Sequence, residues 1–262
     1  MRPHQLQTVV DELNPAVIGL QETKVTDEQF PHEIAQALGY TAFVHGQKTH
    51  YGVAMLVRQD LITDPSAMAA QVIRGFAGEA SDHQRRFIGL KFGDITIYNG
   101  YFPQGESRDH PIKFPAKQAF YERLLALLTQ HDPSEQVIVM GDLNVAPTDL
   151  DVGLTITNAR RWLQTGKCSF LPEERAWLEN VYDWGLTDTF RHIYPDSDAL
   201  SWFDYRSRGF EQEPRRGLRI DHILATKSLL ARCAGVGILH GVRGQAKPSD
   251  HCPVWAEFTT TG

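Results

Sequence analysis

The sequence predicts an α+β fold, a sandwich of β-sheets with helices outside. Segments typical of strands outnumber segments with helical spacing, and the two kinds do not alternate strictly along the chain. The chain has 262 residues, of which 42% are hydrophobic, which is enough for one large domain with a core. Since no Gly/Ser-rich or Pro-rich linker and no internal repeat interrupts it, we expect a single domain over residues 1–262.

The individual elements follow from apolar spacing and end signals. Helices are expected at residues 4–13, 114–130 and 173–184, and a capping-box pattern from Thr26 predicts another up to Leu38, with Gly39 as its stop. Residues 147–171 are polar and we expect them to be irregular. Strands are predicted at 16–21, 40–44, 52–58, 86–92, 95–101, 203–206, 218–225, 233–239 and 254–258, with another at the start of 136–145.

The stretch 136–145 carries the strongest functional signal. It opens with an apolar run typical of a strand buried on both faces, and Gly141 then permits a bend or a close backbone approach. Asp142 and Asn144 follow at i and i+2, so their side chains point the same way if the chain is still extended there. On this segment alone, a strand ending in an Asp/Asn turn explains the pattern equally well.

Charge and cysteine content exclude several classes of protein. The net charge of −6 means that a nucleic-acid partner requires a local basic face. Three widely spaced cysteines form neither a disulfide framework nor a zinc pattern. No apolar run is long enough to span a bilayer, and the first residues lack a signal-peptide core. We therefore expect a cytoplasmic protein with no membrane segment.

Four predicted strand ends deliver polar side chains. Oxygen ligands without thiolates suit Mg²⁺ or Mn²⁺, and a histidine beside a carboxylate suits either a base or a protonated phosphate partner. Taken singly, Glu22 is more often a solvated strand end and Asp250-His251 more often a turn, whereas Asp221 lies among apolar residues and needs a partner if it is buried. The four groups are Glu22, then Asp142 with Asn144, then Asp221, then Asp250 with His251.

Two aromatic segments and several pairs of basic residues are weaker indications of a functional site. Tyr101, in the run 99–105, could donate to a phosphate oxygen, but alone the run is typical of a strand that ends in a Pro-Gly loop. Trp202 is either a pocket wall or, by default, a core aromatic. Basic residues usually lie on solvated surface, but on one face they would form a DNA track. Here they are Arg85-Arg86, Arg160-Arg161, Arg215-Arg216, Lys113 and Lys117.

Together these segments resemble the exonuclease III family of abasic-site endonucleases, within the endonuclease/exonuclease/phosphatase superfamily. The resemblance covers essentially the whole chain, and residues 166–175 and 201–206 look like the bacterial exonuclease III branch in particular. The other segments that carry it are residues 18–24 (IGLQETK), 99–107 (NGYFPQGES), 141–144 (GDLN), 218–221 (LRID) and 249–251 (SDH).

The resemblance implies a four-layer α/β/β/α sandwich of two mixed β-sheets with helices outside. It implies a Mg²⁺- or Mn²⁺-dependent DNA repair nuclease that cuts the phosphodiester 5′ to an abasic site, with 3′-to-5′ exonuclease and 3′-phosphatase action. The partner would be duplex DNA with abasic sites or blocked 3′ ends, and the protein a monomer. Two alternatives stay open: a DNA-binding member that no longer cuts, and a superfamily phosphodiesterase with a non-DNA substrate.

Residue roles are carried over by position. The resemblance implies that Glu22 binds the metal, with Asp142, Asn144, Asp250 and His251 as further candidates. Asp142 would activate the attacking water, Asn144 would hold it, Asp221 would hydrogen-bond His251, and His251 and Tyr101 would contact the phosphate. The deoxyribose pocket would be Trp202, Leu218 and Ile220. The DNA-backbone contacts would be Gln104, Lys113, Asn158, Arg161 and Lys167.

One departure concerns the N-terminus. The family begins with a strand that ends in an Asn-Gly-Leu-Arg segment, whose Asn joins the metal and water network. This sequence aligns with the family only after that strand. We therefore expect lower stability and activity than in a version that carries the strand.

Overall fold

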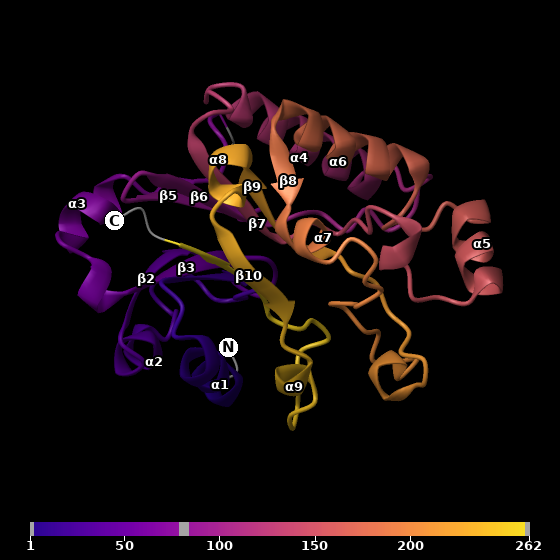
Figure 1. Ribbon diagram of the computed structural model, residues 1–262, viewed down its shortest axis with the longest axis horizontal. Helices are drawn as coiled ribbons and strands as arrows, with labels where there is room; N and C mark the ends of the chain where they lie inside the picture. Colours follow the sequence, from indigo (N-terminus) through magenta and orange to yellow (C-terminus); the bar gives the residue numbers. More distant parts are fainter. Residues whose placement is uncertain (1–2, 79–83, 260–262) are drawn as a thin grey trace. The chain divides into compact units, whose positions relative to one another are not determined.

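The computed structural model describes residues 3–78 and 84–259, which fold into helices and strands of an α+β protein. The chain divides into two compact units, each described by itself below. The first contains Met1–Tyr101 and Val137–Gly141, and the second contains Phe102–Gln136 and Asp142–Gly262. Figure 1 follows the chain through these elements by colour. Within the described residues, none of the helices has the length and apolar character needed to cross a bilayer.

The first unit packs two sheets face to face. β1 (Val17–Gln21), β3 (Val53–Arg58) and β2 (Tyr40–His45) form an antiparallel sheet in the order β1-β3-β2. β4 (Ile73–Arg74), β5 (Phe87–Phe92), β6 (Ile95–Tyr101) and β7 (Gln136–Asp142) follow one another in the second sheet. β3 packs against β5 and β6, and Val53–Val57 are fully buried, with Ala54 and Leu56 in the core on the helix side of their sheet. The strands and the β5–β6 hairpin predicted from the sequence are confirmed.

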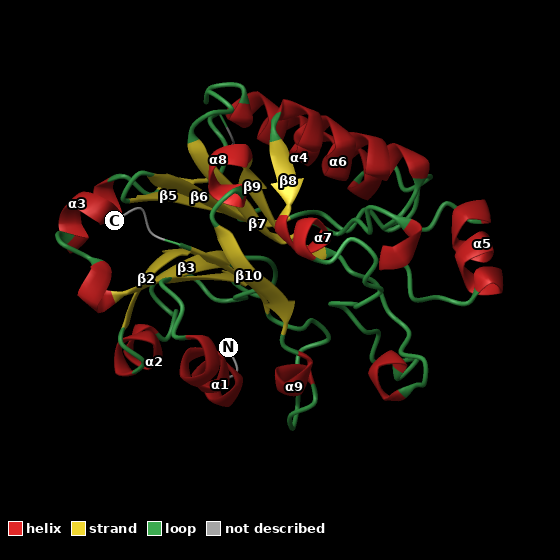
Figure 2. Cartoon of the chain, in the orientation of Figure 1, coloured by secondary structure: helices red, strands yellow, loops and turns green. Residues whose placement is uncertain are grey.

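Helices cover the outer face of the β1-β3-β2 sheet. α1 (Pro3–Leu13) buries Leu6 and Val9, and α2 (His32–Ala37) buries Ala35, in a core shared with β2 and β3. Figure 2 shows α1 and α2 on the same side of these strands. A third helix, α3 (Pro65–Ala70), has Asp64 as its N-cap.

The helix expected from Thr26 begins later than predicted. Residues 27–30 form a turn, and α2 starts at His32. Pro31 precedes the helix, and a proline disfavours helical geometry in the residue before it. Asp27 uses its carboxylate to accept a hydrogen bond from the Gly46 N–H at 2.5 Å instead of capping a helix.

The second unit also pairs strands and packs helices against them. β8 (Leu186–Asp188) is antiparallel to β9 (Asp221–Thr226), β10 (Cys233–Ile238) is antiparallel to β11 (Val254–Phe258), and β9 packs against β11. α4 (Lys113–Leu128) and α6 (Pro172–Trp184) lie side by side. The remaining helices are α5 (Ile156–Gln164), α7 (Thr189–Ile193), α8 (Lys227–Leu230) and α9 (His240–Arg243).

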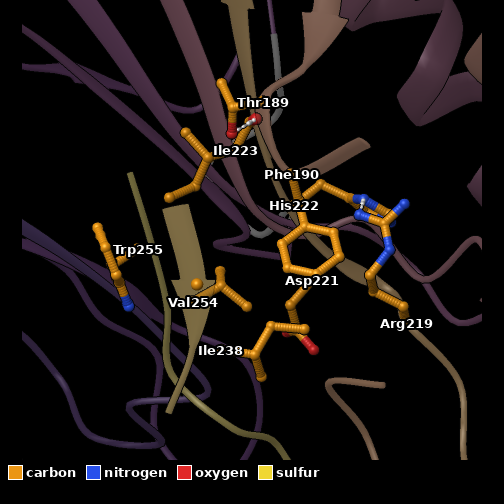
Figure 3. Close-up of a pocket in the computed structure, with 10 residues that line it drawn as sticks. Thr189, Phe190, Arg219, Asp221, His222, Ile223, Ile238, Val254 and Trp255 are labelled. Atoms are coloured by element: carbon orange, nitrogen blue, oxygen red, sulfur yellow. Dashed lines mark hydrogen bonds between the residues drawn. The ribbon is translucent and has the colours of Figure 1, made fainter. Parts of the chain in front are cut away.

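A small hollow lies among α7, β9, β10 and β11 (Figure 3). Phe190, Ile223, Ile238, Val254 and Trp255 line it, together with Arg219, Asp221 and His222. Its volume is at most about 240 Å³, below the roughly 300–1,000 Å³ of typical small-molecule sites. We therefore place no ligand there.

Three local predictions in the second unit are wrong. Residues 203–206 form no strand, because the Asp204 carboxylate accepts hydrogen bonds from the backbone N–H groups of Arg206 and Ser207 and turns the chain. β9 begins only at Asp221, so Leu218 precedes it. The stretch 147–171 contains a helix, α5, that Thr155 caps through the Asn158 N–H.

Candidate active site

Asp142 ends β7 and is held by the residues that follow it. Gly141, with φ of 130°, brings the strand so close to β6 that an added Cβ would lie 2.1 Å from the Gly100 carbonyl oxygen. Asn144 then takes a left-handed conformation, with φ of 54°, instead of the extended one considered above. Its side-chain amide still reaches Asp142, because Nδ2 donates to Asp142 Oδ2 at 2.9 Å and to the Phe102 carbonyl at 3.0 Å.

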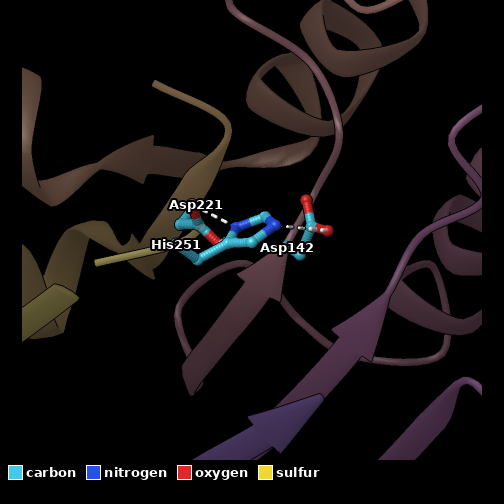
Figure 4. A group of neighbouring side chains, drawn as sticks. All are labelled: Asp142, Asp221 and His251. Carbon is cyan, nitrogen blue, oxygen red and sulfur yellow. Dashed lines mark hydrogen bonds and ion pairs between the residues drawn. The ribbon is translucent and has the colours of Figure 1, made fainter. Parts of the chain in front are cut away.

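His251 lies between two carboxylates (Figure 4). Its Nδ1 is 2.9 Å from Asp221 Oδ1, and its Nε2 is 4.0 Å from Asp142 Oδ2. The side chain of His251 is 29% exposed, whereas both aspartates are buried. One face of the imidazole therefore remains open to a substrate.

The carboxylates decide the charge of the histidine. Burial alone would lower the pKa of His251, but Asp221 and Asp142 raise it more strongly, to about 10. Burial raises the pKa of Asp142 to about 7, opposed by the charge of His251 and supported by that of Asp221. At neutral pH His251 is thus an imidazolium that donates from Nδ1 to Asp221 and presents a second N–H from Nε2.

Ser201 orients Asp221 and is a functional residue that the sequence reasoning missed. Its fully buried hydroxyl donates to Asp221 Oδ2 at 2.6 Å and accepts from the backbone N–H groups of Ile220 and Asp221 at 3.1 Å each. These bonds fix one edge of the carboxylate, so the other is available to His251. The segment that begins with Ser201 stood out in the sequence for its aromatic residues, but no local pattern linked the serine to Ile220 and Asp221, about twenty positions later.

The three residues predicted to form a pocket come together. Leu218 and Ile220 are buried in a cluster with Phe170, and Trp202 packs against it half-buried. Trp202 exchanges backbone hydrogen bonds with Leu218 at 2.8 and 3.0 Å. Trp202 also contacts the pair Asp250-His251 directly, because its indole N–H donates to Asp250 Oδ2 at 3.1 Å and its backbone pairs with that of His251.

A buried charge network supports the loop after Asn144. The Arg219 guanidinium contacts Asp151 at 2.6 Å, Asp188 at 2.7 Å and His222 Nδ1 at 3.1 Å. His222 accepts from Arg219 at Nδ1, so Nε2 carries the proton that it donates to the Val145 carbonyl at 2.9 Å. Arg219 and His222, which flank Asp221 in the sequence, therefore hold Asp151 and the Val145 carbonyl in the chain that follows Asn144.

Glu22 and Tyr101 form a separate group in the first unit. Glu22 follows β1 in a left-handed conformation, with φ of 53°, and is exposed. Tyr101 Oη donates to Glu22 Oε1 at 2.5 Å, and the Lys24 ammonium lies 2.9 Å from Glu22 Oε2. The Arg86 guanidinium stacks on the Tyr101 ring at 4.5 Å. Within this unit, the predicted metal carboxylate and the predicted phosphate donor are in contact.

The predicted DNA contacts lie on loops, at the start of α4 and on α5 of the second unit. Gln104 and Lys113 are exposed, and Lys113 pairs with Glu106 at 2.5 Å. Arg161 is exposed on α5 and Asn158 is half-buried there. The Lys167 ammonium sits 3.7 Å from the centre of the Trp162 ring, which stacks on Phe170 of the pocket cluster.

The donor set of the second unit fits a hard divalent cation. One ligand atom each from Asp142, Asp221 and His251 lies within 4.8 Å of the others. Carboxylate oxygens are the ligands that Mg²⁺ and Mn²⁺ prefer, and a protonated imidazole is not a ligand. The carboxylates are therefore better candidates than His251, and Asp142 is a better one than Asp221, whose two oxygens are already bonded to Ser201 and His251.

A histidine held by two aspartates beside an apolar cluster is an arrangement suited to the hydrolysis of phosphate esters. A model of the Endonuclease/Exonuclease/phosphatase family matches residues 2–251. The chain belongs to this family, and members of it depend in general on divalent metals.

Individual relatives identify the branch. The chain is 53% identical to exodeoxyribonuclease III of Haemophilus influenzae over 98% of its own length and 95% of the relative's. Among solved structures it resembles an AP endonuclease from Archaeoglobus fulgidus, with 31% identity, a TM-score of 0.87 and coverage of 99% and 95%. It also resembles a 3′ phosphatase from Neisseria bound to product DNA hairpin, with 32% identity, a TM-score of 0.83 and coverage of 98% and 94%. The chain is a phosphodiester-hydrolysing DNA repair nuclease of the exonuclease III family.

Proposed function

We propose that this nuclease cuts duplex DNA on the 5′ side of abasic sites and also removes nucleotides and phosphates from 3′ ends. The observation that carries the proposal is the direct contact between Trp202, at the apolar cluster, and the pair Asp250-His251. This contact puts a surface suited to a base-less sugar next to the groups suited to hydrolysis. In this proposal the protein works in the cytoplasm as a monomer.

The hydrolytic groups divide the work. Asp142, whose pKa is raised to about 7, accepts the proton of the attacking water, since a base works best near the ambient pH. The Asn144 amide holds that water or the phosphate. The His251 imidazolium donates to a non-bridging phosphate oxygen and stabilises the charge that develops as the bond to the 3′ oxygen breaks. Asp221 keeps the imidazole charged and oriented.

A divalent cation, Mg²⁺ or Mn²⁺, would supply further stabilisation of the phosphate and leaving-group charge. In the first unit we assign Glu22 to it, and Tyr101 to the phosphate. In the second unit Asp142, Asn144 and Asp250 offer oxygen ligands. We assign His251 to the phosphate and not to the metal, because its carboxylate neighbours keep it protonated.

Recognition rests on the apolar cluster and on the basic residues around it. An abasic nucleotide has no base to stack, so it leaves the duplex at lower cost and enters an apolar slot that excludes a normal nucleotide. Trp202, Leu218 and Ile220 form that slot. The DNA backbone is held by Gln104, Lys113, Asn158, Arg161 and Lys167.

The test uses three labelled duplexes, one with a single abasic analogue, one with a 3′-phosphate and one intact, incubated with Mg²⁺ or with a chelator. We expect nicking at the abasic site and release of the 3′-phosphate with Mg²⁺, and neither with the chelator. Asp142→Asn keeps the shape of the side chain and removes the base, so it should abolish most nicking while leaving DNA affinity nearly intact.

Two results would redirect the proposal. Tight binding of abasic duplex without metal-dependent cleavage would make the chain a DNA-binding member that no longer cuts. Release of phosphate from a phosphoinositide, with no cutting of DNA, would assign it a non-DNA substrate.

A further inference from the structure

Four successive backbone carbonyls after Asp142 are each held by a side chain from elsewhere in the second unit. The Leu143 carbonyl accepts from Tyr121 Oη at 2.8 Å, and the Asn144 carbonyl accepts from Lys117 Nζ at 2.8 Å. The next two carbonyls, of Val145 and Ala146, accept from His222 Nε2 at 2.9 Å and Arg175 Nε at 3.0 Å. Among these donors, Lys117 is the one bonded to Asn144 itself.

Lys117 and its partner Glu174 are fully buried. Both side chains are 0% exposed, and the ammonium donates to Glu174 Oε1 and to the Gln104 carbonyl at 3.3 Å. The second oxygen of Glu174 accepts from the Leu171 N–H at 2.8 Å, at the start of α6. Such a pair costs desolvation free energy that apolar residues of similar size would avoid, so stability is a poor reason for it.

We propose that the Lys117–Glu174 ion pair is a positioning device that holds the Asn144 turn in its reactive conformation. Asn144 is left-handed, a conformation that asparagine adopts more readily than most residues, and here contacts to the carbonyls on both sides of it hold it in place. Tyr121 and Lys117 lie one turn apart on α4. They donate hydrogen bonds to the Leu143 and Asn144 carbonyls, which lie before and after the Cα atom of Asn144. The amide of Asn144 then faces Asp142.

The pair also ties the turn to a second loop of the proposed site. The Gln104 carbonyl shares the Lys117 ammonium with the Asn144 carbonyl, and Phe102, two residues earlier, accepts from the Asn144 amide. A shift of about 1 Å in a reacting group can lower a rate by about 10²-fold. The ion pair therefore acts on the rate of hydrolysis through Asn144, without touching DNA.

This inference rests on the proposed function, and the decisive variant is Lys117→Met with Glu174→Leu, which removes both charges and restores apolar packing. Removing both charges avoids an unpaired buried charge, but the Leu171 N–H and the Asn144 carbonyl lose their partners, so we expect a lower melting temperature. The kinetic constants are therefore compared at a temperature at which both proteins are fully folded. On abasic duplex we expect kcat to fall by about 10- to 100-fold while KM changes by less than about twofold. An increase in KM at the parental kcat, or parental values of both constants, would overturn the proposal.

The matched control is Arg108→Gln with Glu173→Gln. This pair joins a loop to the same end of α6, one residue away, but it is partly exposed and makes no contact with the Asn144 turn. It should keep the parental kcat, and a loss as large as that of the test variant would count against positioning. Tyr121→Phe removes one oxygen and leaves the ion pair intact. If Tyr121→Phe has a lower kcat at the parental KM, the hydrogen bond to the Leu143 carbonyl contributes to positioning. An unchanged kcat contradicts that role.

A spectroscopic readout separates this inference from the proposed function. The side-chain amide resonances of Asn144 should shift between the parent and the Lys117→Met/Glu174→Leu variant, whichever phosphodiester the protein cuts. Unchanged resonances would reject the positioning role even if abasic nicking is confirmed. Shifted resonances in a protein that cuts no abasic duplex would reject the substrate and keep the positioning role.

Discussion

Replacing Ser201 by alanine should affect both folding and catalysis, because one oxygen atom makes three buried contacts. The hydroxyl donates to Asp221 Oδ2 and accepts the N–H groups of Ile220 and Asp221. In Ser201→Ala these N–H groups lose their acceptor, and each unsatisfied buried group costs about 1–3 kcal/mol. We therefore expect the free energy of unfolding to fall by about 2–6 kcal/mol.

The catalytic effect arises from the carboxylate. Asp221 would still bond His251 through Oδ1, but Oδ2 would lose its donor and the carboxylate would be free to rotate. Partners at this distance from a reacting group typically change activity by about 10- to 100-fold. We expect a loss of that size in kcat, since Ser201 is fully buried and does not contact DNA.

The assay combines thermal unfolding with nicking of abasic duplex. At about 2–4 °C for each kcal/mol, the melting temperature of Ser201→Ala should fall by roughly 4–24 °C. Ser228→Ala is the control, because Ser228 is exposed and its hydroxyl makes only long contacts of 3.4 and 3.5 Å. A Ser201→Ala protein with parental melting temperature and kcat would refute the role that we assign to this hydroxyl.

Three further predictions follow from the site and its surroundings. Trp202→Ala should weaken discrimination for abasic over intact duplex by about 1–3 kcal/mol, measured by competition binding, and equal losses on both DNAs would exclude Trp202 as pocket wall. Arg161→Gln and Lys167→Gln should each reduce the slope of log affinity against log salt by about one, and an unchanged slope would remove that residue from the DNA contacts. Burial raises the pKa of Asp188 but Arg219 lowers it further, so the folded-state pKa lies below the unfolded one. The stabilisation by Asp188 is thus complete above a pH of about 4 and is lost as the pH falls. In urea unfolding, Asp188→Asn should lower the free energy of unfolding by about 3–5 kcal/mol at pH 7 and by less at pH 3. A decrease that does not depend on pH would contradict this.

The strand ends of the site could be predicted because each is a local pattern. An apolar run followed by Asp142, or by Glu22, reports the strand and its exit within a few residues. The apolar cluster of Trp202, Leu218 and Ile220, expected from the family resemblance, also comes together.

Other features depend on contacts that the local pattern does not contain. Ser201 and Lys117 act through residues that are distant in sequence, so no spacing rule could identify them. Asp204 turns a segment whose aromatic alternation is typical of a strand. Helix α5 has no buried residue and is polar on average, so its sequence is typical of an irregular surface segment although its few apolar residues share one side.

Most of β7 belongs to the first unit although it follows a segment of the second unit in the sequence, and this order has a consequence for synthesis on the ribosome. The first unit includes Val137–Gly141, but the intervening residues 102–136 belong to the second. Although β4 to β6 emerge early, β7, the neighbour of β6 in their sheet, is translated only after α4, a delay of seconds at about 5–20 residues per second. During that interval β6 presents an unpaired edge, which is a typical site of aggregation. Slowing translation within residues 102–136 should therefore lower the yield of folded protein, and chaperone binding to nascent chains should concentrate in this window.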